Sequence, residues 1–194
     1  NYCPDTAYGG ALTLERDGQE KRYGITWLCT GKYGWQKTLA HEMGHTFGMG
    51  HSSDSSEDVY SNPWDIMSVC SYCRINPAYG LIAQHPIAYQ KDQLGWIPAE
   101  RKYVAQPGSP VQITLEQLAQ PSADGYLMAV IPLPGEGGRF YTVEARRRAG
   151  WTAACSRRPT PTTWWWLRVS ATRRRTRARR GPNRATASSR ARCW

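Results

Sequence analysis

The stretch HEMGHTFGMGH, residues 41–51, is the most informative part of this chain. It lies in a segment whose apolar residues recur at helical spacing, so we predict a helix over Trp35–Met49 that glycines such as Gly48 end. On that helix His41 and His45 are one turn apart and project from the same face, about 6 Å apart along the axis. The sequence therefore predicts two imidazoles aimed at one point.

Two imidazole nitrogens at this spacing can each reach one zinc ion at about 2.0–2.1 Å. Gly48 tolerates a positive φ, so the chain can leave the helix sharply and bring His51 back as a third ligand. Three neutral His leave the fourth position open, which is the condition for a catalytic rather than a structural zinc. Glu42 is poorly aimed for coordination but can reach a metal-bound water as general base. The alternatives are a helix with surface His, or a zinc site that has lost its activity.

The pattern HExxHxxGxxH resembles the metzincin clan of zinc metalloendopeptidases. Those enzymes carry a Met-turn below the zinc-binding histidines, and the segment DIMS, residues 65–68, resembles it at 16 residues from His51 to Met67. The resemblance implies that Met67 supports the histidines as a soft apolar floor and does not ligate zinc. Some relatives place a Tyr two residues after this Met, but Val69 stands there, so that role is not carried over.

Two later segments extend the resemblance over roughly residues 10–151. AYQKDQLGWI at 88–97 is similar to a stretch of gametolysin-like and immune-inhibitor-A-like secreted peptidases, and 140–151 is similar to the strand that follows in them. The resemblance implies an α+β, zincin-like fold with a mixed sheet over the zinc-binding helix and a β-rich segment after it. Clan members have more chain before this helix, so we expect the catalytic fold to be incomplete at its N-terminus.

The remaining elements follow from local patterns. Asp17-Gly18 is a turn signal between two candidate strands, the first of which would be the edge strand that pairs with substrate. Residues 52–80 are rich in Ser, Asn, Pro and Gly and are predicted to be loop. On the helix, Leu39, Met43 and Phe47 should pack on the core. The predicted strands are Ala11–Glu15, Arg22–Cys29, Val111–Leu115, Tyr126–Leu133 and Phe140–Ala145, with a second helix over Pro86–Leu94.

The positive charge is concentrated in the last segment of the chain. The net charge is +10, but 12 of the 25 Lys and Arg are arginines of the last segment, which has no Lys and no acidic residue. That segment shows no hydrophobic period of 2 or 3.6, and its composition resembles a GC-rich gene translated in the wrong frame. A disordered basic tail and a selected nucleic-acid or membrane arm are the alternatives. We predict a partial catalytic domain at 1–100, a β-rich extension at 101–151 and an Arg- and Trp-rich tail at 152–194.

Other residues carry weaker signals. The body has an even number of cysteines, which fits disulfides in a secreted protein with three possible connectivities. An acidic run could bind calcium through its oxygens or be an ordinary solvated loop. His85 is predicted to be a surface residue. These cysteines are Cys3, Cys29, Cys70 and Cys73, and the acidic run is Asp54, Glu57 and Asp58.

We predict a secreted, monomeric zinc endopeptidase that hydrolyses protein or peptide substrates, with no nucleic-acid or membrane partner. The longest apolar stretch is far shorter than the roughly 20 residues needed to cross a bilayer. One alternative is an inactive zinc-binding or truncated form of such an enzyme. The other is a basic nucleic-acid-binding protein that acts through the tail.

Overall fold

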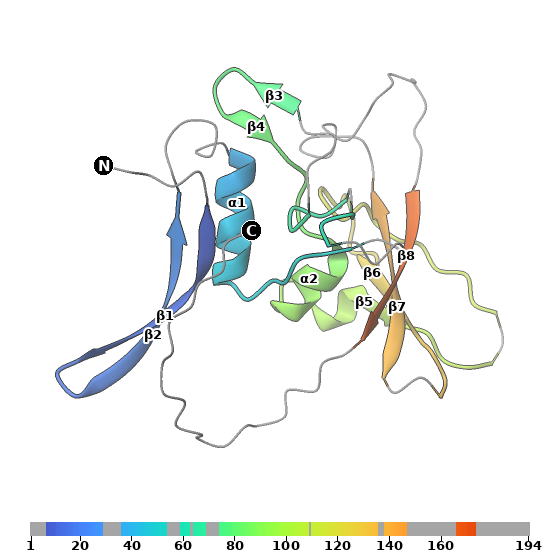
Figure 1. Cartoon of the computed structure of the whole chain (residues 1–194). Helices are drawn as coiled ribbons and strands as arrows, with labels where there is room; N and C mark the ends of the chain where they lie inside the picture. Colours follow the sequence, from blue (N-terminus) through green and yellow to red (C-terminus); the bar gives the residue numbers. More distant parts are fainter. Residues whose placement is uncertain are drawn as a thin grey trace.

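The computed structural model describes residues 7–28, 36–53, 59–62, 64–68, 74–108, 110–135 and 138–146, and the backbone of 166–173. In this part of the chain the fold is α+β, with small sheets and few helices. A β-hairpin and the first helix lie on one side, the second helix lies in the middle, and a four-stranded sheet lies on the other side (Figure 1).

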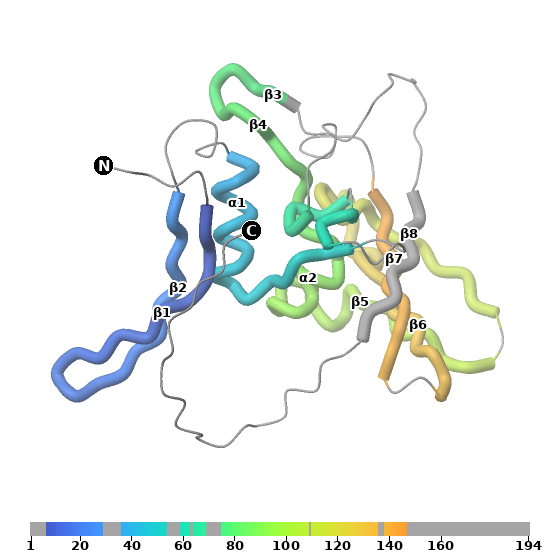
Figure 2. The backbone as a smooth tube through the Cα atoms, in the orientation of Figure 1, coloured from blue at the N-terminus to red at the C-terminus, as the bar shows by residue number. Residues whose placement is uncertain are grey.

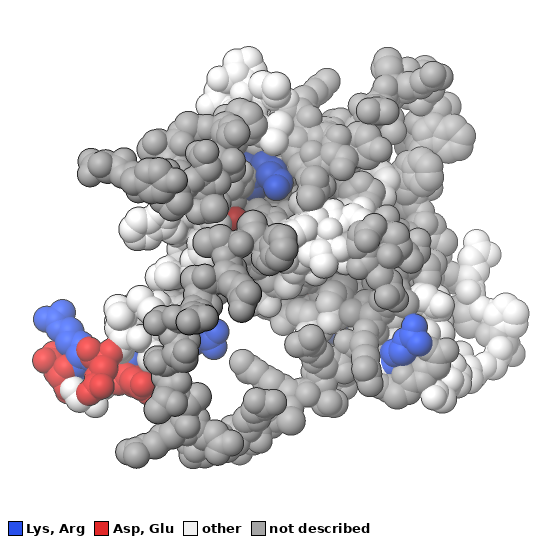
Figure 3. Space-filling model, in the orientation of Figure 1, with Lys and Arg blue, Asp and Glu red and all other residues white. Residues whose placement is uncertain are grey.

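The hairpin consists of β1 (Tyr8–Arg16) and β2 (Gln19–Trp27), paired antiparallel. Asp17 and Gly18 both have positive φ, 55° and 72°, as a two-residue turn of the primed kind requires. The predicted hairpin is confirmed, with longer strands than the pattern indicated. Acidic and basic side chains gather together at its tip (Figure 3).

Helix α1 (Gln36–Thr46) carries the first part of the motif. It ends three residues earlier than predicted, because Gly48 adopts a φ of +91°. The Gly48 N–H donates to the His45 carbonyl at 3.0 Å, and the Met49 N–H donates to the Gly44 carbonyl at 3.0 Å. These two bonds form the Schellman ending of a helix. The predicted role of Gly48 is confirmed, and the chain then crosses from α1 towards the middle of the molecule (Figure 2).

The predicted core stripe of α1 is wrong. Leu39, Met43 and Phe47 are 40%, 40% and 51% exposed, while His41 and Glu42 are buried. The packing partners of α1 approach it where small residues permit, not where its apolar residues lie. Gly9 of β1 touches the backbone of Glu42, and Met67 lies directly against Gly44. The face that carries the motif is therefore the buried one.

The four-stranded sheet has the order β5-β6-β7-β8 and is mixed, because only the pairing of β5 with β6 is parallel. We expected the mixed sheet to lie over the helix that carries the histidines. Among the described residues this prediction is wrong. The sheet against α1 is the two-stranded antiparallel hairpin, and the mixed sheet packs on α2. The strands are β5 (Lys102–Val104), β6 (Met128–Pro132), β7 (Arg139–Arg146) and β8 (Trp166–Arg173), the last from the Arg- and Trp-rich segment.

Other elements differ in detail from the prediction. The region expected to be loop contains a short hairpin of β3 (Arg74–Asn76) and β4 (Gly80–Ile82). Helix α2 (Ala88–Gln93) begins two residues after Pro86, and a 3-10 turn (Ala99–Arg101) follows it. The strand predicted at 111–115 is absent from this described stretch, where Leu115 makes a single bridge to Tyr126. An alternating pattern alone does not make a strand, because it also needs a neighbouring strand to pair with.

Two apolar clusters form the core. The first joins α2 to the mixed sheet and consists of Ala88, Ile97, Leu118, Leu127 and Met128. It therefore contains residues from both of the predicted parts, 1–100 and 101–151. The second lies beneath the histidine motif and consists of Met49, Ile66, Met67 and Ala83.

Several predictions fall outside the described residues. They concern the four body cysteines, the acidic run at 54–58, Val69 and the side chains of the tail. Within the described residues, no helix combines the length and the apolar character needed to cross a bilayer.

Candidate metal centre

The structure brings the three predicted ligands together. The candidate ligand atoms of His41, His45 and His51 all lie within 4.8 Å of one another. Their ring centroids are 4.6–5.4 Å apart. Exposure rises from the buried His41 through the half-buried His45 to the exposed His51. This arrangement can hold a metal ion and leaves it accessible from the side of His51.

Backbone carbonyls orient the first two rings. The His41 Nδ1 lies 2.8 Å from the Ile66 carbonyl oxygen, and the His45 Nδ1 lies 3.0 Å from the Met49 carbonyl oxygen. A carbonyl can only accept, so each Nδ1 carries the proton and each Nε2 keeps its lone pair for a metal. Such outer partners select the tautomer and hold the ring in place. Spacing along the sequence did not predict either carbonyl.

The loop that carries His51 is held from two sides. The Gln90 side chain, on α2, donates from Nε2 to the Gly50 carbonyl at 2.8 Å. The Ser52 N–H donates to the Met67 carbonyl at 3.1 Å. These bonds grip the residues immediately before and after the ligand, so the exposed imidazole stands on a fixed backbone. Gln90 is a positioning residue that the sequence reasoning missed, because no local pattern connects positions 40 residues apart.

Helix α2 is itself fastened to the mixed sheet by a buried ion pair. The Arg146 Nε lies 2.5 Å from the Glu144 Oε1, and both side chains are buried. The other Glu144 oxygen accepts from the Ala88 N–H at the start of α2. The pair therefore fixes the helix that carries Gln90 relative to β7.

Met67 packs beneath the helix that carries His41 and His45. It is fully buried, and its N–H donates to the Asp65 Oδ1 at 3.2 Å. A Cβ added at Gly44 would fall on the Met67 sulfur, so the helix and the turn are in direct contact. Burial raises the pKa of Asp65, and the hydrogen bond from the Met67 N–H opposes that rise, while the Ser68 N–H donates to the Asp65 carbonyl at 3.1 Å. The turn is therefore closed by its own hydrogen bonds.

Burial also sets the protonation of the ligands. It lowers the pKa of His41 to about 4, although the hydrogen bond to Ile66 opposes the shift. It lowers the pKa of His51 as well, with a further contribution from the charge of His45. Desolvation disfavours the charged imidazolium, so both rings are neutral at neutral pH. A neutral ring is the form that binds a metal.

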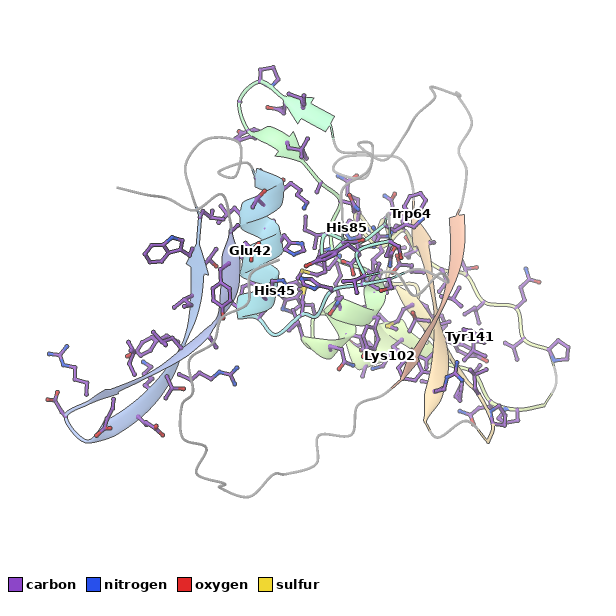
Figure 4. All side chains as sticks on the ribbon, in the orientation of Figure 1. Glu42, His45, Trp64, His85, Lys102 and Tyr141 are labelled. Atoms are coloured by element: carbon purple, nitrogen blue, oxygen red, sulfur yellow. The ribbon has the colours of Figure 1, made fainter. Side chains whose placement is uncertain are left out.

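Glu42 lies on the hairpin side of the histidines and is buried (Figure 4). Burial raises the pKa of its carboxyl, opposed by the charges of His45 and Lys37 and by a hydrogen bond from the Gly9 backbone. A carboxylate with a raised pKa is a stronger proton acceptor than an exposed one. Glu42 thus has the electrostatic setting of a general base.

Tyr60 is a further residue beside the histidines. Its ring centroid lies 4.1 Å from that of His51 and 6.1 Å from that of His41. It adopts a φ of 70°, which is uncommon for a residue with a side chain. Burial and the charge of Glu42 raise the pKa of its hydroxyl, so the group is a neutral hydrogen-bond donor. The sequence offered no signal for it, because it lies in the region predicted to be loop.

Three imidazole ligands suit zinc and also copper, iron and nickel, so the donor set admits several metals. No protein-family model matches this chain, and no curated protein or solved structure matches it. The function must therefore be argued from the geometry of the centre itself.

Proposed function

We propose that this chain is a zinc-dependent endopeptidase with a zincin-like, metzincin-type catalytic centre. The observation that carries the proposal is the convergence of three His nitrogens, two of them oriented by backbone carbonyls, beside a buried glutamate. A surface cluster of histidines would need neither the carbonyl partners nor the buried methionine beneath them.

Zinc fits this site because it favours imidazole nitrogen and tolerates a three-ligand set with one open position. His41, His45 and His51 would hold it. When bound, zinc supplies Lewis acidity, which polarises the scissile carbonyl and makes water a stronger nucleophile at neutral pH.

The residues of the chain would supply the proton transfers. Glu42 accepts a proton from the attacking water as its oxygen bonds to the carbonyl carbon, and then gives that proton to the leaving amine as the C–N bond breaks. The Gly9 N–H and the charge of Lys37 favour the ionised carboxylate, against the larger effect of burial. Protein or peptide substrates and a location outside the cell follow from the same proposal.

The test is cleavage of an unfolded protein substrate by the full chain, beside Glu42→Gln. We expect activity that a chelator removes and zinc restores, and a loss of at least about 100-fold in Glu42→Gln with unchanged zinc content. Glu20→Gln, at an exposed glutamate of β2, is the matched control and should keep full activity.

Cleavage by Glu42→Gln at the rate of the parent chain would refute the mechanism. Stoichiometric zinc binding without any cleavage would favour the alternative of an inactive zinc-binding protein. Salt-sensitive nucleic-acid binding that disappears when residues 152–194 are deleted would favour the other alternative.

A further inference from the structure

A pocket of about 300 Å³ lies against the face of α1 that does not carry the histidines, and it shares Gly44, Met49 and Ile66 with the support of the histidine centre. Its helical wall is a stripe of α1 that recurs every three to four residues and includes Gln36, Ala40, Met43 and Phe47. His41 and His45 lie on another face of the helix. Trp96, after α2, forms part of the opposite wall. The volume is at the lower end of the range for small-molecule sites.

Most of the lining is apolar, but two buried polar atoms belong to it. The Gln36 Oε1 and the His85 Nε2 have no hydrogen-bond partner among the described residues. Buried polar atoms are nearly always paired, and leaving one unpaired costs about 1–3 kcal/mol. Two such atoms in the wall of one pocket indicate that an occupant supplies their partners.

Both atoms are acceptors. The His85 Nδ1 lies 2.7 Å from the Pro86 carbonyl oxygen, which can only accept, so Nδ1 carries the proton and Nε2 offers a lone pair. The prediction that His85 is a surface residue is wrong, since the side chain is half-buried between α1 and the mixed sheet (Figure 4). An amide oxygen at Gln36 offers lone pairs in the same way.

The described residues that line the pocket include no Asp, Glu, Lys or Arg, which suits an uncharged occupant. The Arg146 guanidinium donates to the carbonyls of His85 and Pro86 at 3.4 and 3.1 Å. Burial, helped by the positive charges of Arg146 and Lys91, lowers the pKa of His85 to about 2. The Arg146 charge is already paired with Glu144, so a charged ligand would find no counter-ion among the described lining residues.

We propose that this pocket binds an uncharged small molecule with an apolar body and a hydroxyl or N–H donor that reaches Gln36 or His85. The apolar body packs on Met43, Phe47 and Trp96, which are otherwise exposed to solvent. The pocket contains none of the three histidines, although Met49 and Ile66 belong to both sites, and its binding of a ligand does not depend on the proposed peptidase activity.

The test uses three probes with the same body: 4-propylphenol, 4-propylanisole and 4-propylbenzoate. Calorimetry on the full chain should show that the phenol binds about 3- to 10-fold more tightly than the anisole, which lacks the donor. The charged benzoate should bind more weakly than both. Equal affinity for the phenol and the anisole would overturn the assignment of the donor.

Variants locate the site. Gln36→Met and His85→Phe keep the apolar volume but remove an acceptor, so each should reduce the preference for the phenol. Ala40→Leu adds bulk to the wall and should weaken binding of both the phenol and the anisole by at least tenfold. Gln19→Met, on β2, is the matched control and should change nothing.

Circular dichroism on each variant establishes that it is folded. His85 takes part in partly buried hydrogen bonds, so His85→Phe is the variant at greater risk of not folding. In that case Gln36→Met, at the start of α1, decides the test. Absence of binding by the folded parent chain at millimolar phenol would overturn the proposal. So would a phenol preference that persists in every folded acceptor variant.

Discussion

The two sides of this molecule differ in how they are held together. The β1–β2 hairpin leaves large apolar side chains in water, with Trp27 68% and Tyr8 57% exposed. The β7 strand of the mixed sheet buries Val143 and Ala145 and also carries the buried Arg146–Glu144 pair. Buried apolar surface is the main source of stability, so the mixed-sheet side should be the more stable of the two.

The candidate site spans both sides. The histidines depend on the well-packed side, since Ile66, Met49, Met67 and Gln90 hold their rings or their backbone. Glu42 instead accepts a hydrogen bond from Gly9 of the exposed hairpin. Metal binding should therefore depend on the packed side, and proton transfer on the hairpin. Changes on the packed side should affect the metal, and changes in the hairpin should affect turnover.

The largest effect should come from removing a ligand. His41→Ala in the full chain should weaken zinc binding by more than about 100-fold, because even the loss of an outer partner costs 10- to 100-fold. Competition with a chromogenic chelator measures the affinity. Leu39→Ala, on the same helix but exposed, should bind zinc as the parent does, and unchanged affinity in His41→Ala would show that the metal lies elsewhere.

Truncation beneath the histidines should follow in size. Met67→Ala leaves a cavity in the second apolar cluster and should lower the free energy of unfolding by about 2–5 kcal/mol. Met43→Ala, at a methionine that is 40% exposed, should cost less than about 1 kcal/mol. Urea unfolding of the apo proteins measures both. Equal losses would mean that the Met-turn contributes no more than the exposed face of the helix.

Gln90 tests whether α2 positions the third ligand. Gln90→Leu removes the donor to the Gly50 carbonyl and should weaken zinc binding by about tenfold, at the lower end of the cost of an outer partner. Gln93→Leu, an exposed position on the same helix, should bind zinc normally. Unchanged affinity in Gln90→Leu would mean that the Ser52–Met67 bond alone holds the loop.

The smallest effect concerns the hairpin. A Cβ at Gly9 would fall on the Glu42 carbonyl, so Gly9→Ala should displace β1 and remove its hydrogen bond to the carboxylate. We expect about tenfold slower peptide cleavage with unchanged zinc affinity. Thr13→Ala, at an exposed position of the same strand, is the control. Loss of zinc from Gly9→Ala would contradict the separation of the two sides.

Local patterns were enough to predict the cluster of His41, His45 and His51, which could hold a metal ion, and several elements. Histidines four residues apart on a helix share a face, because the helix repeats every 3.6 residues. Glycine ends a helix readily because it tolerates a positive φ, and Asp-Gly favours the tight turn of a hairpin for the same reason. The strands near 128–132 and 139–146 were predicted for the same reason, since their apolar runs are bounded by turn residues.

Only the tertiary structure decided which face of α1 is buried, and which partners hold the site. The Ile66 carbonyl lies 25 residues from His41 along the chain, and Gln90 lies 40 residues from Gly50. Such contacts have no period and no fixed spacing, so no window of sequence contains them. The apolar stripe of α1 predicted a core that the fold instead built on Gly44 and Met67, because a close approach of helix and turn depends on the absence of a side chain.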